Sequence, residues 1–186
     1  MDITFITSNP VKAQQLGWHI NYPIKHQKLA IPELQSLYLD EVIEHKAKAA
    51  YKFIKSPVLV EDFSLVLHAL GKLPGPLIKW FWEEIGTTGV CNLLSNTSDK
   101  TATATVAFGL YNGKDFHLYK GSIKGTIANS PRGEQKFGSD AIFIPKGYAK
   151  TWSEMSKEEQ MATSIRGMAL KKLEKYLHQT ERVKVG

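Results

Sequence analysis

The chain has 186 residues, of which 42% are hydrophobic, and a formal net charge of +6 at pH 7. This size and apolar content suit a single domain over residues 1–186, and no apolar run approaches the roughly 20 residues that a membrane helix needs. The opening residues 1–5 lack a basic segment and predict a strand rather than a secretion signal. The single Cys91 excludes an internal disulfide and fits the reducing cytoplasm, where we expect the protein to act.

The positive charge is compatible with nucleic acid, an anionic surface or a phosphorylated small molecule as partner. The lysines are scattered through polar stretches, however, and no basic run carries the interleaved aromatic residues of a nucleic-acid-binding surface. We therefore expect neither a nucleic acid nor a membrane as partner.

In the first half of the chain, short apolar runs alternate with segments of helical periodicity. In chain order we predict a strand at 3–7, a helix from 10 through 18, a strand at 22–27, a helix at 40–54, a strand at 58–60 and helices at 76–84 and 88–94. Asp40 is placed to cap the helix that follows it. Pro10 and Pro76 lie in first helical turns, where proline is tolerated.

In the second half, residues 101–127 alternate and are rich in Thr, Val, Tyr and Phe, which predicts two or three antiparallel strands. Asn112-Gly113 is a strong hairpin signal between them. A further strand is predicted at 141–144, and a long helix at 155–178 after a capping pattern at Ser153. This order predicts an α/β protein with a mixed sheet and two lobes.

Two apolar runs are followed by polar residues of the kind that bind phosphate and metal. The run 3–6 is followed by Thr-Ser-Asn-Pro-Val-Lys, and the run 58–60 by Glu61 and Asp62. Ligands of α/β proteins bind at the carboxyl ends of strands, so these segments predict a site. Glu61 and Asp62, with Glu33 as a further candidate, suit Mg²⁺, which takes a few carboxylate oxygens together with water and phosphate. Taken alone, such acids are more often solvated surface groups.

Three lysines lie near these segments and are candidates for phosphate contacts. They are Lys12, Lys46 and Lys79. The alternative for Lys46 is an exposed position on an amphipathic helix, and for Lys79 a side chain extended along an apolar helix. The P-loop pattern GxxxxGK[ST] is absent, which excludes an ordinary P-loop protein.

Residues 137–140, Phe-Gly-Ser-Asp, place an aromatic side chain beside a turn and a carboxylate. A nucleobase would stack on Phe137 while Asp140 accepts from ring N–H groups. The alternative is a core phenylalanine and a turn aspartate, and the spacing alone favours that alternative.

These segments, in this order, resemble the inosine triphosphate pyrophosphatase family. The matching blocks are TSNPVK at 7–12, IPE at 31–33, VED at 60–62, ALGKLPGP at 69–76, IKWF at 78–81, FGSD at 137–140 and SIR at 164–166. The resemblance covers nearly the whole chain. It implies a two-lobed fold in which helices flank a long mixed sheet, with the active cleft between the lobes. It also implies a homodimer and Mg²⁺-dependent hydrolysis of a purine nucleoside triphosphate to the monophosphate and pyrophosphate.

Position by position, the resemblance gives Asp62 two roles, as a magnesium ligand with Glu33 and as the group that activates the attacking water. It places Arg166 at the edge of the base and gives phosphate contacts to the three lysines named above. The implied substrate contacts are Thr7, Ser8, Asn9, Lys12, Lys46, Phe63, Lys79, Phe137, Gly138, Ser139, Asp140, Gln160, Ile165 and Arg166.

This sequence departs from the family pattern at five of these positions. Ser8 replaces a glycine, Phe63 a threonine, Ser139 a tryptophan, Gln160 a lysine and Ile165 a histidine. The metal and phosphate groups are thus largely retained, while the residues that would recognise the base are altered. We expect the discrimination between purines to be poorer than in a typical member.

Three hypotheses remain at this point. The leading one is an active pyrophosphatase with altered base preference. The first alternative, a non-catalytic relative that binds nucleotides or a partner protein, is favoured by Gln160 and Ile165. The second alternative, a nucleic-acid-binding module, rests on charge alone. The sequence also leaves open whether Ile165 belongs to the apolar stripe of its helix or lines a remodelled base pocket.

Overall fold

The computed structural model describes residues 2–134 and 138–185, without the side chains of residues 11, 15, 18 and 181–185. The elements in chain order are β1 (Ile3–Ile6), α1 (Pro10–His19), β2 (Ile24–Gln27), α2 (Leu39–Ile54), β3 (Val58–Leu67), η1 (His68–Leu70), β4 (Pro74–Gly75), α3 (Ile78–Asn92), β5 (Thr101–Tyr111), β6 (Phe116–Ile127), β7 (Phe143–Pro145), η2 (Trp152–Glu154), α4 (Lys157–Ala162) and α5 (Ile165–Val185). None of the helices in these ranges is long and apolar enough to cross a membrane.

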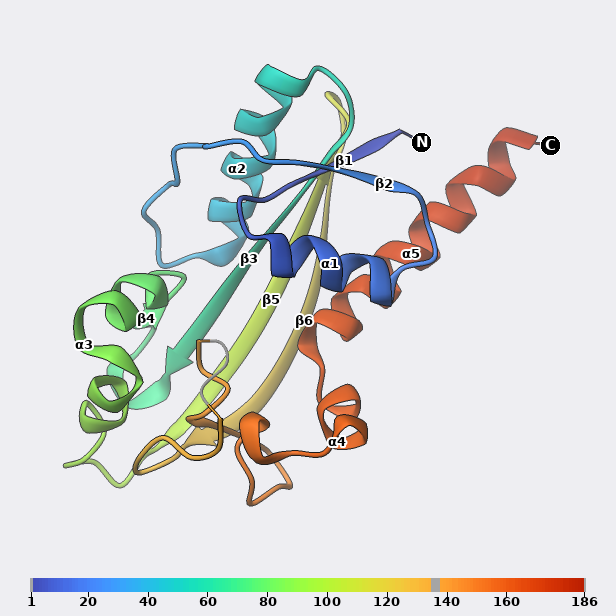
Figure 1. Cartoon of the computed structure of the whole chain (residues 1–186). Coiled ribbons are helices and arrows are strands. Elements are labelled where there is room, and N and C mark those ends of the chain that lie inside the picture. The colour runs from blue at the N-terminus through green and yellow to red at the C-terminus, as the bar shows by residue number, and fades with distance from the viewer. Residues whose placement is uncertain (1, 135–137, 186) are drawn as a thin grey trace.

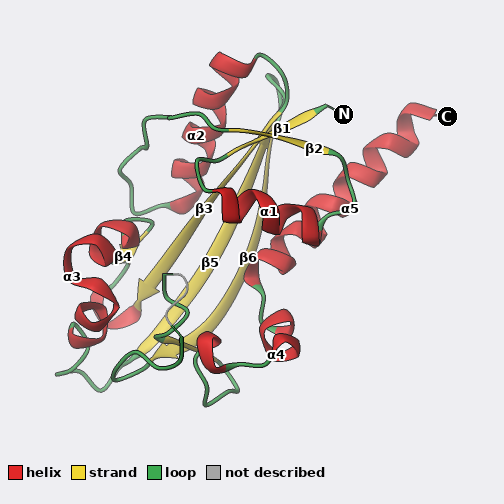
Figure 2. Cartoon of the chain, in the orientation of Figure 1, coloured by secondary structure: helices red, strands yellow, loops and turns green. Residues whose placement is uncertain are grey.

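A seven-stranded mixed sheet forms the centre of the molecule, with strand order β2-β1-β3-β5-β6-β7 and β4 paired to β3. β1 is parallel to β2 and to β3, whereas β3, β5, β6 and β7 are antiparallel. Figure 1 shows α2 beside the upper end of the long strands and α3 and α4 towards their lower end, with α1 passing in front of their middle. The same arrangement is coloured by element type in Figure 2. The predicted α/β class with a long mixed sheet flanked by helices is confirmed.

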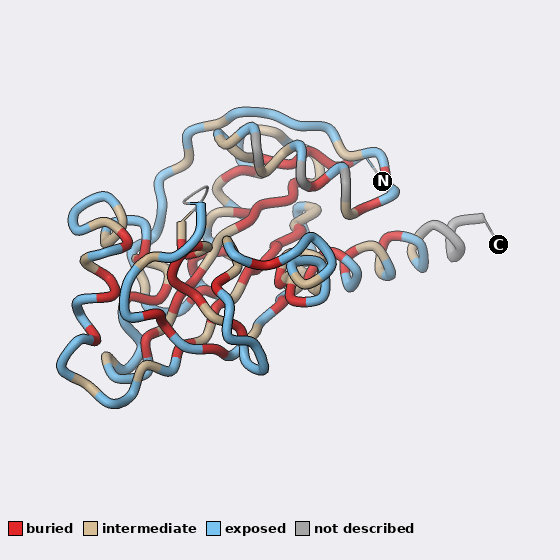
Figure 3. The backbone as a smooth tube through the Cα atoms, turned by 60° about the horizontal axis from the view of Figure 1, so that its bottom comes forward, coloured by how far each residue is buried: buried red, intermediate tan, exposed pale blue. Residues whose placement is uncertain are grey.

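The sheet has an apolar core on each face, because successive side chains of a strand point to opposite sides. Leu59 lies in the larger core with Phe5, Phe108 and Leu173 of α5. Val58 and Val60 lie in the second core, with Ile43, Ala47 and Ala50 of α2. Figure 3 shows the buried backbone segments running through the centre of the molecule, with exposed loops around them. The alternation of β3 therefore decides which face each of its later polar side chains reaches.

β3 is much longer than the strand predicted at 58–60, and this changes the position of Glu61 and Asp62. Pairing with β5 continues from Val58 to Leu67, so both acids lie inside a strand and not after its end. On the other edge of β3, the pairing with β1 ends at Leu59, and the pairing with β4 begins at Leu65. The described strands thus leave residues 60–64 of β3 unpaired on that edge. A polar site forms there because the sheet opens, not because the strand stops.

The predicted helix at 155–178 is two helices. α4 begins after Ser156, whose side chain accepts a hydrogen bond from the backbone N–H of Glu159 in a capping box, so Ser153 is not its cap. The chain turns at residues 163–164, and the hydroxyl of Ser164 accepts from the N–H of Gly167 at 3.0 Å, at the start of α5. The turn brings the first residues of α5 to the open edge of β3.

Candidate active site

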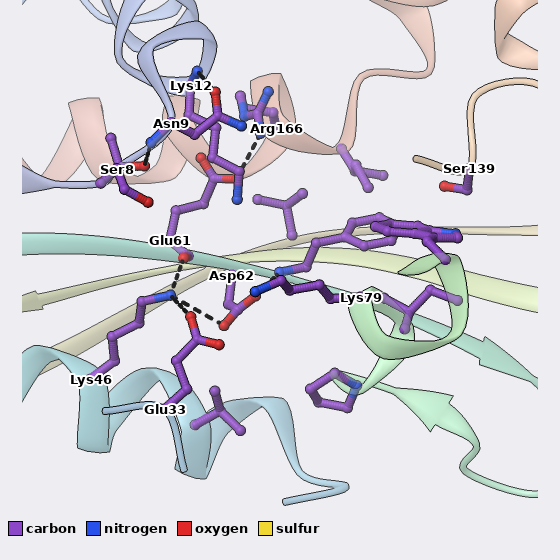
Figure 4. A pocket seen from close by; sticks show the side chains of 18 of the residues that line it. Ser8, Asn9, Lys12, Glu33, Lys46, Glu61, Asp62, Lys79, Ser139 and Arg166 are labelled. Carbon is purple, nitrogen blue, oxygen red and sulfur yellow. Dashed lines mark hydrogen bonds and ion pairs between the residues drawn. The ribbon is translucent and has the colours of Figure 1, made fainter. Parts of the chain in front are cut away.

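A pocket of about 1180 Å³ lies over the open edge of β3. Its lining comes from the β1–α1 turn, the segment before α2, α2, β3, the start of α3, residues 139–140 and the α4–α5 region. Figure 4 shows the pocket from close by. The predicted site residues that line it are Thr7, Ser8, Asn9, Lys12, Glu33, Lys46, Asp62, Phe63, Lys79, Ser139, Asp140, Gln160, Ile165 and Arg166. Gly138 is absent from this lining, and Phe137 lies outside the described residues.

The β1–α1 turn is held by its own side chains. The N–H of Asn9 donates to the Thr7 hydroxyl at 3.1 Å, and the N–H of Lys12 donates to the Asn9 side-chain oxygen at 3.4 Å. Asn9 thus occupies the capping position of α1, and Ser8 is exposed beside it. The positive end of a helix dipole favours an anion at such a turn.

Lys46 of α2 lies between the two acids predicted to hold a metal. Its Nζ is 3.2 Å from Glu33 Oε1, 3.4 Å from Asp62 Oδ2 and 3.3 Å from the backbone oxygen of Glu61. Burial disfavours the charge on Lys46, but the carboxylates of Asp62 and Glu33 outweigh it and raise the pKa of the ammonium above its usual value. Lys46 is therefore a positive charge held at one point between two carboxylates, as Figure 4 shows.

Two carboxylates cannot enclose a metal ion, so an ion held by Glu33 and Asp62 would need water or substrate phosphates as further ligands. Among the side chains that the structure describes, no group of three or more from His, Cys, Asp or Glu is placed to hold an ion. Mg²⁺ takes one or two carboxylates and completes its octahedron with water and substrate phosphates. Glu33 and Asp62 offer such a pair, and Asp62 Oδ1 is oriented by the N–H of Phe63, which donates to it at 2.8 Å.

Glu61 lies on the other face of the sheet and is not part of this pair. Its side chain is buried between two cations, with Oε1 at 3.1 Å from Lys12 Nζ and 2.6 Å from Arg166 Nη2. Burial tends to raise the pKa of Glu61, but Lys12 and Arg166 outweigh it and hold the pKa below its usual value. Our interpretation of Glu61 and Asp62 as adjacent metal ligands is wrong, because strand alternation sends the two carboxylates to opposite faces. The sequence signal for this role is the position of Glu61 directly after a buried apolar run, because a charge that continues such a strand needs oppositely charged partners.

Three of the five residues that depart from the family pattern, Ser139, Gln160 and Ile165, line the part of the pocket formed by residues 139–140 and the α4–α5 region. Ser139 is buried, and burial raises the pKa of the neighbouring Asp140 to about 6, although Arg166 opposes the shift. The sequence left open whether Ile165 belongs to the apolar stripe of its helix or lines a pocket. It does both, because it is part of the larger core and also lines this pocket. The amide of Gln160 donates to the backbone oxygens of residues 152 and 155, at 2.8 and 3.3 Å. Its N–H groups therefore brace the turn before α4.

Lys79 stands apart from the other two lysines. Its side chain is 60% exposed, and its Nζ lies 3.7 Å from Glu83 and 5.2 Å from the ring centroid of Trp80. It comes from the first turn of α3 and lines the same pocket as Lys12 and Lys46. Lys79 is thus an exposed cation at the rim, and its predicted phosphate contact stays a prediction.

The pocket combines a helix N-terminus, two lysines and two carboxylates at the edge of a sheet, which is typical of α/β proteins that bind a metal–polyphosphate. The model of the Ham1 family matches residues 3–176, and the chain belongs to this family. The inosine triphosphate pyrophosphatase of Yarrowia lipolytica is 42% identical over 183 residues, which cover 95% of this chain and 96% of that protein. Inosine triphosphate pyrophosphatase 2 of Trypanosoma cruzi is 41% identical over 174 residues, 90% of this chain and 88% of that protein. The Staphylococcus aureus Ham1 protein shares the fold, with a TM-score of 0.84 at 24% identity over 97% of this chain and 100% of its own.

Proposed function

We propose that the chain hydrolyses purine nucleoside triphosphates of the inosine and xanthosine type, including the deoxy forms, to the monophosphate and pyrophosphate. The observation that carries this proposal is the convergence of Glu33, Asp62 and Lys46 at one point on the open edge of β3. The names of the relatives at 41–42% identity support the same activity. The non-catalytic alternative is not favoured, because the groups that the reaction needs are assembled in one pocket.

In the reaction, a water oxygen attacks the α-phosphorus, a new P–O bond forms and the bond from the α-phosphorus to the bridging oxygen breaks. Pyrophosphate leaves with that oxygen. Asp62 would accept the proton of the attacking water and, with Glu33, would hold Mg²⁺. When bound, the metal neutralises phosphate charge in the transition state.

The cations of the pocket would bind the triphosphate. Lys46, whose Nζ lies between Glu33 and Asp62, would donate to phosphate oxygens when those two carboxylates hold the metal. Lys12 and the first turn of α1 provide a second contact, and Lys79 closes the opposite side. Charge-assisted hydrogen bonds of this kind are the strong ones, so little other chemistry is required of the protein.

We further propose a cytoplasmic homodimer in which residues 1–186 form one domain, without nucleic acid or membrane as partner. Exposed apolar side chains on neighbouring segments support self-association. Tyr38, before α2, is 53% exposed, and Lys72 Nζ donates to its hydroxyl at 2.7 Å. Leu73, next to Lys72, and Trp80 of α3 are exposed as well. Sedimentation at twice the monomer mass of 20.9 kDa would support the dimer, and a monomer at micromolar concentration would contradict it.

The activity is tested with inosine, xanthosine, guanosine and adenosine triphosphates in the presence of Mg²⁺. We expect monophosphate and pyrophosphate in equal amounts, and specificity constants that are higher for the three 6-keto purines than for adenosine triphosphate. In water labelled with oxygen-18, the label is expected in the monophosphate. Release of orthophosphate, or no turnover of any of the four, would contradict the proposal.

A further inference from the structure

Two aromatic side chains form part of the pocket wall and touch each other. Phe63 of β3 and Trp82 of α3 are stacked, with ring centroids 5.7 Å apart and an interplanar angle of 23°. Both line the pocket, and both are partly buried against the larger core. The two residues are 19 positions apart in sequence, and their stacked rings form one aromatic surface.

This surface lies on the side of the sheet where the pocket reaches residues 139–140 and α5. Side chains of β3 alternate, so Phe63 shares a face with Glu61 and not with Asp62. Glu61 is bonded to Arg166, and Leu65 on the same face belongs to the core that contains Ile165. Phe63 thus follows Asp62 directly in sequence, but its side chain is on the face of the sheet where Glu61 meets Arg166.

The indole of Trp82 has an unused donor. Its Nε1 is buried and has no hydrogen-bond partner among residues 2–134 and 138–185. Native structures pair nearly all buried polar atoms, and each exception calls for an explanation such as a ligand that supplies the missing partner. Because Trp82 lines the pocket, a base that rests against its ring is a candidate to supply the missing acceptor.

The segment after residue 137 packs directly on this indole. Gly138 has φ = +47°, and a Cβ at that position would lie 2.8 Å from Cη2 of Trp82. The next residue, Ser139, is buried and carries no ring, although the family pattern has tryptophan there. α3 therefore supplies an indole beside the segment in which Ser139 replaces the tryptophan of the family pattern.

We propose, on the basis of the proposed function, that Phe63 and Trp82 form the aromatic wall against which the purine base rests, and that Trp82 Nε1–H donates to an acceptor of that base. Asp140 and Arg166 then face the polar edge of the same base. Every base has a π-face, so stacking on this wall tolerates different purines. The wall provides affinity, and the polar groups around it provide the choice among bases.

The test separates the base from the triphosphate. KM and kcat for inosine triphosphate are measured for the wild type, Trp82→Leu and Trp82→Phe, with inorganic tripolyphosphate as a competitor that has no base. Trp82→Leu is expected to raise KM about 5- to 150-fold, the range of a lost base–aromatic stack, while kcat stays within about threefold. The inhibition constant of tripolyphosphate is expected to stay within about twofold of the wild type. Trp82→Phe keeps a ring but loses the N–H, and a KM about 2- to 10-fold higher is expected.

Phe81→Leu is the matched control. Phe81 precedes Trp82 in α3 and packs on the same core, but it does not line the pocket. We expect its KM for inosine triphosphate to equal that of the wild type at similar thermal stability. An unchanged KM in both Trp82 variants would overturn the inference, as would an equal rise in the tripolyphosphate inhibition constant, which would place the effect at the phosphates or in the fold.

Failure of the proposed pyrophosphatase activity can be distinguished from failure of the aromatic wall. A wild type that hydrolyses none of the triphosphates would contradict the pyrophosphatase activity alone. Calorimetric titration of inosine triphosphate against tripolyphosphate then tests the aromatic wall without turnover. A nucleotide affinity that falls in the Trp82 variants but not in Phe81→Leu supports the wall, and equal affinities in all of them refute it. If Trp82→Leu does not fold, Trp82→Phe alone carries both comparisons.

Discussion

Replacing Glu61 by glutamine is expected to destabilise the fold strongly. The side chain is 1% exposed and lies between Lys12 Nζ at 3.1 Å and Arg166 Nη2 at 2.6 Å. Glutamine keeps the size but leaves two cations without their shared anion. Loss of one partner of a buried ion pair costs about 3–5 kcal/mol. The side chains of Lys12 and Arg166 are 18% and 17% exposed and retain some water, so we expect a loss at the lower end of this range. About 3 kcal/mol lowers the melting temperature of a chain of this size by about 6–12 °C.

The assay is urea unfolding of Glu61→Gln and wild type at several pH values, followed by circular dichroism. Lys12 and Arg166 depress the pKa of Glu61 in the folded state, so its contribution is present above the unfolded pKa near 4.5 and is lost as the pH falls through the folded pKa. The difference in unfolding free energy between Glu61→Gln and the wild type is therefore expected to become smaller only at acidic pH. Glu83→Gln, an exposed acid 3.7 Å from Lys79, is the control and is expected to change the unfolding free energy by less than about 0.5 kcal/mol. A loss below about 1 kcal/mol at pH 7, or one independent of pH, would refute the reasoning.

Three further predictions concern the substrate. Lys12→Ala and Lys46→Ala are each expected to lower kcat/KM about 10- to 150-fold through a lost charge-assisted contact, and unchanged kinetics in stably folded variants would contradict the proposed phosphate contacts of both lysines. Burial raises the pKa of Asp140 to about 6, so its accepting carboxylate form is lost below that pH. KM for inosine triphosphate is expected to rise as the pH falls through 6 in the wild type but not in Asp140→Asn, and identical profiles would contradict this. Ile165→His is expected to change the ratio of specificity constants for inosine and guanosine triphosphates by about tenfold or more. An unchanged ratio, or a wild type that already prefers inosine triphosphate strongly, would exclude the lost imidazole as the cause of poor discrimination.

The sequence predicted the sheet well where its pattern is local. The alternation over residues 101–127 and the turn at Asn112-Gly113 correspond to β5 and β6, which pair along their whole length. The end of β3 was not predictable in this way. Glu61 and Asp62 interrupt an apolar run and so indicate a strand end, yet the strand continues because β5 pairs with it and because α1, α2 and α5 supply partners for both carboxylates.

The candidate site shows the same division. The residues of the polar segments were found by type and order, because a metal and a polyphosphate need acids and lysines. The roles of Glu61 and Trp82 were missed, because each depends on a contact between distant segments. Glu61 meets Arg166 across 105 positions, and Trp82 stacks on a ring from another element. Neither contact leaves a periodic signal in the sequence.

The most direct test of the account is the amount of inosine monophosphate and pyrophosphate released by Asp62→Asn with Mg²⁺, compared with the wild type. Asparagine keeps the side-chain oxygen that accepts from the N–H of Phe63, so the fold and melting temperature are expected to be preserved. It cannot accept a proton from water and is a poorer ligand for Mg²⁺. Product formation is expected to fall by at least about 100-fold, with both products lost together. Release close to the wild-type rate from a stably folded Asp62→Asn would contradict it.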